Sequence, residues 1–162
     1  MHVLTNPLIY DIILSDIKTR MVIIVNIEDT ISAAGVSTSS QEWQFVLKHI
    51  YINFPVDVKN LNCQKCIPCV FSKNTIVGYS VIKDTQGYII STETGIVILC
   101  PKKNDFPVTD WIPKKDIRIV ESESKFLKHS VRLKTNDTSY TFKTDKETAK
   151  KIEALINSVR FS

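Results

Sequence analysis

Residues 87–100 read Gly87-Tyr-Ile-Ile-Ser-Thr-Glu-Thr-Gly-Ile-Val-Ile-Leu-Cys100, and this stretch decides the fold class. Two apolar runs rich in β-branched residues flank the polar triplet Glu93-Thr-Gly95, which has the composition of a turn. The pattern predicts a β-hairpin of two short strands, Gly87–Thr92 and Gly95–Cys100. Ile, Val and Thr make up 51 of the 162 residues against only 4 Ala, a balance that favours strands over helices throughout the chain.

Similar short runs lie on both sides of this hairpin, and most of them are separated by predicted turns at 72–74, 84–87, 93–95 and 136–138. The break at Pro101–Pro113 carries three prolines, so it cannot be a central strand. Alternation of polar and apolar residues is clearest at 128–134. We predict seven strands in all: Cys66–Phe71, Thr75–Lys83, Gly87–Thr92, Gly95–Cys100, Asp116–Glu121, Lys128–Thr135 and Ser139–Lys143.

The chain ends in an amphipathic helix. Thr144 or Asp145 is the expected cap, and Glu147 follows in the first turn. One face of this helix is apolar, so the helix must cover an apolar surface. The apolar face consists of Ile152, Leu155, Ile156 and Val159.

Residues 1–62 form a different region, with both strand and helix signals. Met21–Ile27 is predicted as a buried strand and Ser32–Ser40 as a loop. Ser39 and Glu42 match a capping box, which predicts a helix at about 40–51. Its apolar face carries Trp43, Val46, Leu47 and Ile50 at helical spacing.

Three segments resemble the pleckstrin-homology-like superfold, in particular its bacterial PH and GRAM-like branch. They are the hairpin at 87–100, Trp111–Val120 as the entry to a fifth strand, and Phe126–Phe142 followed by the helix Asp145–Val159. The resemblance covers roughly residues 66–160. It implies an antiparallel barrel whose open end is plugged by the C-terminal helix.

We therefore expect a mainly β (α+β) fold, in which a PH-like seven-stranded antiparallel barrel or sandwich is closed by the C-terminal amphipathic helix. Residues 1–62 are an α+β N-terminal extension, and residues 63–162 are the PH-like domain.

The resemblance implies a non-catalytic binding module, an adaptor that binds a protein partner or assembles with itself, and not an enzyme. Candidate partner-binding residues are Phe106 and Trp111 in the proline-containing break, and Trp43 on the N-terminal helix. The alternative for each is a ring that packs into the core. An extended peptide would add to an exposed strand edge beside the C-terminal helix.

Binding to acidic membrane lipids is a second hypothesis. Residues 1–62 carry 4 basic and 6 acidic side chains, whereas residues 63–162 carry 17 basic and 11 acidic ones, so the excess of positive charge is C-terminal. The resemblance implies a phosphate site around the connection between the first two strands. There the sequence offers only Lys73 and Lys83.

Cysteines suggest a third hypothesis, a metal or redox site. Cys63, Cys66 and Cys69 are spaced three residues apart, and Cys100 would supply a fourth thiolate for zinc or an iron–sulfur cluster. The alternative is four small buried thiols. Thiols this close in sequence do not suit a disulfide framework, which favours a reduced, cytoplasmic setting.

Several function classes are excluded by the sequence. Four scattered glycines leave no phosphate-binding loop, and no dense Lys/Arg block with interleaved aromatics points to nucleic acid. No apolar stretch approaches the roughly 18–20 residues of a membrane span, so any membrane association would be peripheral.

Overall fold

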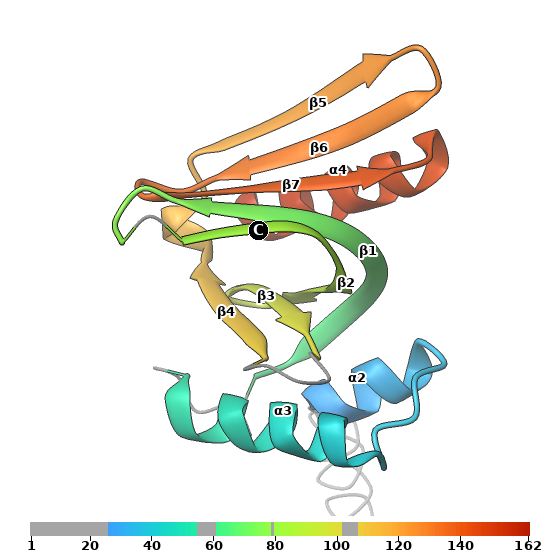
Figure 1. Ribbon diagram of the computed structural model, residues 1–162, viewed down its shortest axis with the longest axis vertical. Helices are drawn as coiled ribbons and strands as arrows, with labels where there is room; N and C mark the ends of the chain where they lie inside the picture. The colour runs from blue at the N-terminus through green and yellow to red at the C-terminus, as the bar shows by residue number, and fades with distance from the viewer. Residues whose placement is uncertain (1–25, 55–60, 79, 102–106) are drawn as a thin grey trace, which may run out of the picture.

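The computed structural model describes residues 26–54, 61–78, 80–101 and 107–162 (Figure 1). This part of the chain is mostly β, with one seven-stranded antiparallel sheet and three α-helices. The strands are β1 Cys63–Thr75, β2 Ser80–Thr92, β3 Gly95–Cys100, β4 Val108–Pro113, β5 Ile119–Lys125, β6 Lys128–Lys134 and β7 Thr138–Thr144. The helices are α2 Ile27–Ala33, α3 Gln41–Asn53 and α4 Lys146–Arg160, with a 3₁₀ turn η2 at Lys114–Asp116.

The sheet curls but does not close. Its strand order is β4-β3-β2-β1-β7-β6-β5, so β4 and β5 are its two ends and do not pair with each other. The predicted mainly β fold with seven antiparallel strands is confirmed, whereas the sheet forms no closed ring.

β1 joins the two halves of the sheet. It pairs with β2 over its whole length, but with β7 only from Val70 to Thr75. Figure 1 shows β1 bending where it passes from one half to the other. Pro68 lies in the section without a β7 partner, where its missing N–H costs no ladder bond on that side.

Two predicted turns lie inside strands. The turn expected at 72–74 is part of β1, and the turn expected at 84–87 is an irregularity within β2, opposite a register shift between Phe71 and Lys73. Asp84 has φ 41°, and its backbone N–H donates to Ser72 Oγ at 3.0 Å. The real connection between β1 and β2 lies at 76–79, where Gly78 has φ 89°. A positive-φ residue thus marks a bulge where the sequence suggested a turn.

β4 is the strand that the sequence prediction missed. Pro101–Pro113 was expected to contain no central strand, and β4 is indeed a terminal strand of the sheet. An end strand needs hydrogen bonds on one side only, so the nearby prolines are tolerated. The count of seven was right because the prediction had split β2 into two strands.

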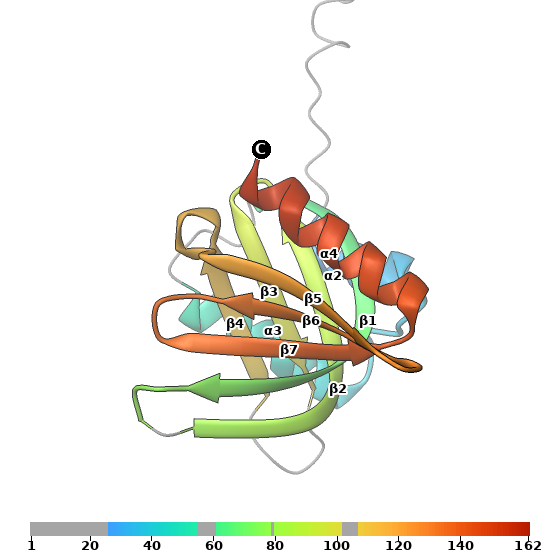
Figure 2. The same cartoon turned by 90° about the horizontal axis from the view of Figure 1, so that it is seen from above.

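The main core fills the concave side of the curled sheet, and α4 covers it (Figures 1 and 2). Phe71 and Phe142 are fully buried there, with ring centroids 6.4 Å apart. Gly87 is required at this place, because a Cβ would collide with the Leu99 carbonyl oxygen and come within 2.7 Å of the Phe71 ring. The face of α4 predicted from the sequence is confirmed: Ile152, Leu155, Ile156 and Val159 are all buried.

A second core lies between the outer face of β1–β3 and the helices α2 and α3. The whole of β3 is buried because alternate side chains enter different cores, with Ile96 and Ile98 in the main core and Val97 and Leu99 under the helices. A strand covered on both faces is a continuous apolar run, as the sequence of 95–100 is.

The helix ends follow ordinary capping. Asp145 caps α4 by accepting from the N–H groups of Glu147 and Thr148, as predicted. α3 is capped by Ser40 and not by Ser39, one residue later than expected. Of the strand predicted at 21–27, residues 21–25 lie outside the described part, and Ile27 begins α2. None of the helices described is both long and apolar enough to cross a membrane.

Candidate binding site

Trp111 lies within β4 and not in a loop. Its side chain is partly buried against the second core, with its ring centroid 6.3 Å from that of Phe54. It also covers Gly95, where an added Cβ would lie 2.7 Å from the nearest ring atom. Phe106 lies outside the described residues, so the predicted aromatic pair stays a prediction.

Trp43 is in the core. Its side chain is 6% exposed, and its ring lies 5.4 Å from that of Tyr88 on β2. The surface predicted around Trp43 is therefore corrected. The sheet of this chain covers the ring, and no partner can reach it without displacing α3. The structure shows the alternative, in which the Trp43 ring packs into the core.

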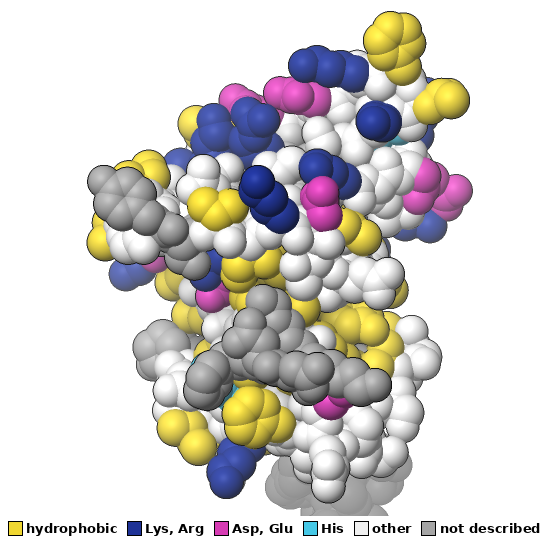
Figure 3. Space-filling model, in the orientation of Figure 1, with side chains coloured by type: hydrophobic (Ala, Val, Ile, Leu, Met, Phe, Trp, Pro, Cys, Tyr) yellow, Lys and Arg dark blue, Asp and Glu magenta, His cyan; other side chains and the backbone are white. Residues whose placement is uncertain are grey.

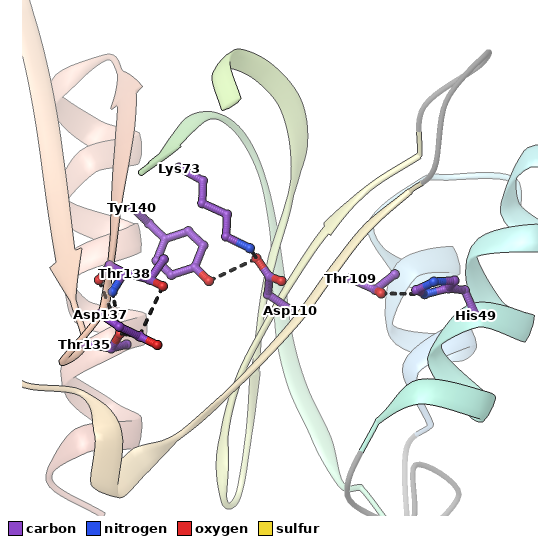
Figure 4. Close-up of polar contacts among 8 residues, drawn as sticks. All are labelled: His49, Lys73, Thr109, Asp110, Thr135, Asp137, Thr138 and Tyr140. Carbon is purple, nitrogen blue, oxygen red and sulfur yellow. Dashed lines mark hydrogen bonds and ion pairs between the residues drawn. The ribbon is translucent and has the colours of Figure 1, made fainter. Parts of the chain in front are cut away.

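Lys73, predicted as a lipid ligand, already has its charge paired within the chain. Its Nζ lies 2.7 Å from Asp110 Oδ2 and 5.8 Å from the ring centroid of Tyr140, and the side chain is 18% exposed (Figure 4). Lys83 is exposed on β2. The two lysines predicted as one phosphate site thus differ in availability.

A cleft of about 370 Å³ opens beside this ion pair. Asp110 is the central residue of the polar cluster that lines this cleft. It forms the ion pair with Lys73 and also accepts a hydrogen bond of 2.9 Å from the Tyr140 hydroxyl. Burial, followed by the negative charge of Asp110, raises the pKa of Tyr140, so the phenol stays a neutral donor. Asp137, on the same cleft, accepts from the hydroxyls of Thr135 and Thr138.

These groups satisfy one another, and they join the end strand β4 to the neighbouring strands β1 and β7, which are several places away in the sheet order. Asp110 is on the end strand β4, Lys73 on β1 and Tyr140 on β7. The cluster therefore ties β4 across the open side of the sheet. On the opposite face of β4, Thr109 bonds His49 Nδ1 of α3 at 2.8 Å (Figure 4). Thr109 and Asp110, which are neighbours on β4, thus hold this strand both to α3 and to strands β1 and β7.

The four cysteines are not brought together. Cys63 and Cys66 face the second core under the helices, whereas Cys69 and Cys100 lie in the main core on the other face of the sheet. Within the described residues, no group of three or more His, Cys, Asp or Glu side chains is arranged to hold a metal ion. A β-strand sends alternate side chains to two faces, so these thiols lie on both sides of the sheet, and the four-thiolate site stays a prediction.

Burial also makes these thiols poor nucleophiles. It raises the pKa of Cys63 to about 11 and the pKa of Cys66 and Cys69 to about 12. Near neutral pH the Cys66 thiol therefore stays almost wholly protonated.

We expect native protein to react with a thiol-specific disulfide reagent much more slowly than free cysteine at pH 8. The thiolate is the reactive form, so the rate should rise about tenfold per pH unit between pH 7 and pH 9. The reaction is followed by the absorbance of the thiolate that the reagent releases. Cys66→Ser is the control, because Cys66 is the most exposed of the four cysteines. A fast phase at pH 7 that Cys66→Ser abolishes would show an activated thiol instead.

The strand edge expected beside the C-terminal helix is β5. β5 is an end strand that pairs only with β6, and most of its residues are exposed. The C-terminal end of α4 is fixed beside it, because Arg160 Nη2 donates to the carbonyl of Arg118, just before β5. The register places Val120, Ser122 and Ser124 on the inner face, opposite Leu133, Val131 and His129 of β6.

The sequence prediction missed two features of this region. It ended the strand at Glu121, four residues before β5 ends. It also gave no role to Phe126 and Leu127, which form the turn between β5 and β6. The sequence does contain a signal for this unusual turn. Two large apolar residues lie between Lys125 and Lys128, where a hairpin turn normally has Asn, Asp or Gly.

No model of a known protein family matches the sequence, and a search of curated proteins also finds no match. Among solved structures, the chain is similar to the crystal structure of the C-terminal domain of an unknown protein from Leishmania infantum. The two have 16% sequence identity and a TM-score of 0.49, over 72% of this chain and 99% of that one.

Proposed function

We propose that this chain is a non-catalytic interaction module that binds an extended segment of a protein partner along β5, beside α4. The observation that carries the proposal is the one-sided pairing of β5, an exposed strand at the end of the sheet. An unpaired edge offers backbone N–H and C=O groups that an incoming strand can pair with.

The side chains of β5 specify what kind of strand fits. Ser122 and Ser124 are small and exposed on the inner face, so they leave room for apolar side chains of the partner beside α4. On the outer face are Glu121 and Glu123, whose ion-pair partners lie 3.6–3.8 Å away on β6. The preferred partner segment therefore alternates apolar residues with Lys or Arg.

We also propose that the fold is PH-like. Three features support this: a first strand shared by both halves of the sheet, a gap between the fourth and fifth strands, and a C-terminal helix that covers the core. The resemblance noted in the sequence covers the same elements. Fold alone does not assign a ligand, so the binding role rests on β5.

Ser122→Lys is expected to weaken partner binding strongly while leaving the protein folded. A lysine at this position puts a long charged side chain into the space that an added strand would occupy, and inward charges on edge strands block such pairing. Peptides would be selected from a random display library on the wild-type protein. Their affinities for wild type and variant would then be measured by calorimetry, and we expect a loss of about tenfold or more.

Ser37→Lys is the matched control, because Ser37 is also exposed but precedes α3, away from β5. Amide shifts in NMR spectra should locate the selected peptides on 119–125 and α4. Peptides that shift other residues, or that bind Ser122→Lys as well as wild type, would contradict the proposal. If the chain self-associates through β5, its apparent mass in solution should rise with concentration, and Ser122→Lys should abolish that rise.

A further inference from the structure

The turn between β5 and β6 exposes two large apolar side chains. Phe126 is 103% exposed and Leu127 93%, more than any other large hydrophobic residue described. Figure 3 shows hydrophobic side chains projecting at this end of the molecule, with Lys and Arg side chains beside them. In Figures 1 and 2 the hairpin ends away from the rest of the sheet.

The backbone of this turn is unfavourable for the residue that occupies it. Phe126 has φ 55°, in the left-handed region that bulky residues rarely adopt. Hairpin turns with a positive φ at the first position prefer Gly, and Asn or Asp are next best. A small polar residue would both relax the backbone and remove an exposed ring. Folding therefore does not explain why phenylalanine is present.

The charges around the turn are also unfavourable for folding alone. Lys125 and Lys128 are direct cross-strand partners, and like charges in such a pair repel. Neither lysine forms an ion pair with any described residue. Glu123 is the acidic residue closest to Lys125 along β5, and its carboxylate already lies 3.8 Å from the Arg132 guanidinium.

A shallow hollow of about 600 Å³ lies next to Leu127, and cations are prominent in its lining. Lys125, Lys128 and Lys143 contribute three positive charges, and His129 adds an imidazole. Asp84 and Glu123 are the acidic groups. Asp84 already pairs with Lys143 at 2.7 Å, so the positive charges of Lys125 and Lys128 stay available.

We propose that this hairpin tip docks on an anionic lipid bilayer. Phe126 and Leu127 enter the boundary between headgroups and acyl chains, and Lys125 and Lys128 lie at the level of the negative headgroups. Two apolar side chains are removed from water, and the repulsion between the lysines is relieved by lipid charge. A projecting tip suits a bilayer, which yields to it, whereas a protein partner would need a preformed socket.

This site differs from the peptide surface proposed on β5, with which it shares only Lys125, the last residue of that strand. It also lies at the opposite end of the sheet from the connection between β1 and β2 (Figure 1). The resemblance assigned phosphate binding to that connection, with Lys73 and Lys83.

The test is binding of the full chain to vesicles of phosphatidylcholine with about 30% phosphatidylserine, measured by co-sedimentation at about 0.1 M salt. Phe126→Ser with Leu127→Ser should weaken binding by roughly tenfold to hundredfold, because the two side chains supply the buried apolar area. Lys125→Gln with Lys128→Gln should weaken it by roughly tenfold and reduce its salt dependence.

Ile76→Ser with Val77→Ser is the matched control, since these residues are 72% and 73% exposed on the connection between β1 and β2. It should bind within about twofold of wild type, because it leaves the hairpin tip intact. The indole fluorescence gained in Phe126→Trp should be quenched by lipids that carry a spin label just below the headgroup. The proposal is overturned if wild type does not bind these vesicles, if the control weakens binding as much as the tip variant, or if the added indole is not quenched.

Discussion

Replacing Phe142 with alanine is expected to lower the free energy of unfolding by about 3–5 kcal/mol, the largest loss of stability that we expect from a single substitution. Phe142 is fully buried on β7, next to the Phe71 ring of β1. The residue also pairs with both Phe71 and Val131 in the sheet, so it lies where the two halves meet. Removal of the ring leaves a cavity that rigid strands on both sides cannot fill.

Thr141→Ala is the matched control. Thr141 is the preceding residue of the same strand, points to the outer face and is only partly buried. Its replacement should cost less than about 1 kcal/mol. Urea denaturation followed by circular dichroism measures both variants. Equal costs for the two would mean that β7 contributes through its backbone ladder and not through the Phe142 ring.

Asp110→Ala is expected to cost about 2–3 kcal/mol, since it leaves two partly or fully buried groups without a partner. The Lys73 ammonium loses its carboxylate at 2.7 Å, and the Tyr140 hydroxyl loses its acceptor at 2.9 Å. Because Asp110 ties β4 to β1 and β7, amide hydrogen exchange in β4 should also become faster.

Asp116→Ala is the control on the same cleft, because it removes the same charge from a side chain that forms no ion pair with described residues. It should change the free energy of unfolding by less than about 0.5 kcal/mol. Lys73→Met in the Asp110→Ala background should restore part of the loss, since the unpaired charge is then gone. Without such coupling between the two positions, the ion pair does not hold β4.

The sequence predicted well those elements whose pattern is local. Gly95–Cys100 was predicted with its observed bounds, and the apolar face of α4 with all four of its residues, because both patterns repeat within a few residues. The turn at 136–138 joins β6 to β7 as expected. Periodicity and capping need no knowledge of the rest of the chain.

Features that depend on distant residues were not predictable in this way. Asp84 has turn composition, but its N–H is held by Ser72 twelve residues earlier, and the strand continues. Lys73 looked available for a ligand because nothing in its sequence neighbourhood shows Asp110 beside it. Cys63, Cys66 and Cys69 share a regular spacing, yet strand geometry sends them to opposite faces of the sheet.

The pairing of β1 with β7 also determines when the chain can fold during its synthesis. Residues 70–75 lie beside residues 138–143, and this is the one ladder that joins the two halves of the described sheet. A ribosome must therefore make almost the whole domain before the halves can meet, and α4 follows later still. Such non-local closure is slow, typically milliseconds to seconds. Until then the nascent chain exposes the inner face of β1–β3 and one edge of β1, so this interval is when aggregation and chaperone binding compete with folding.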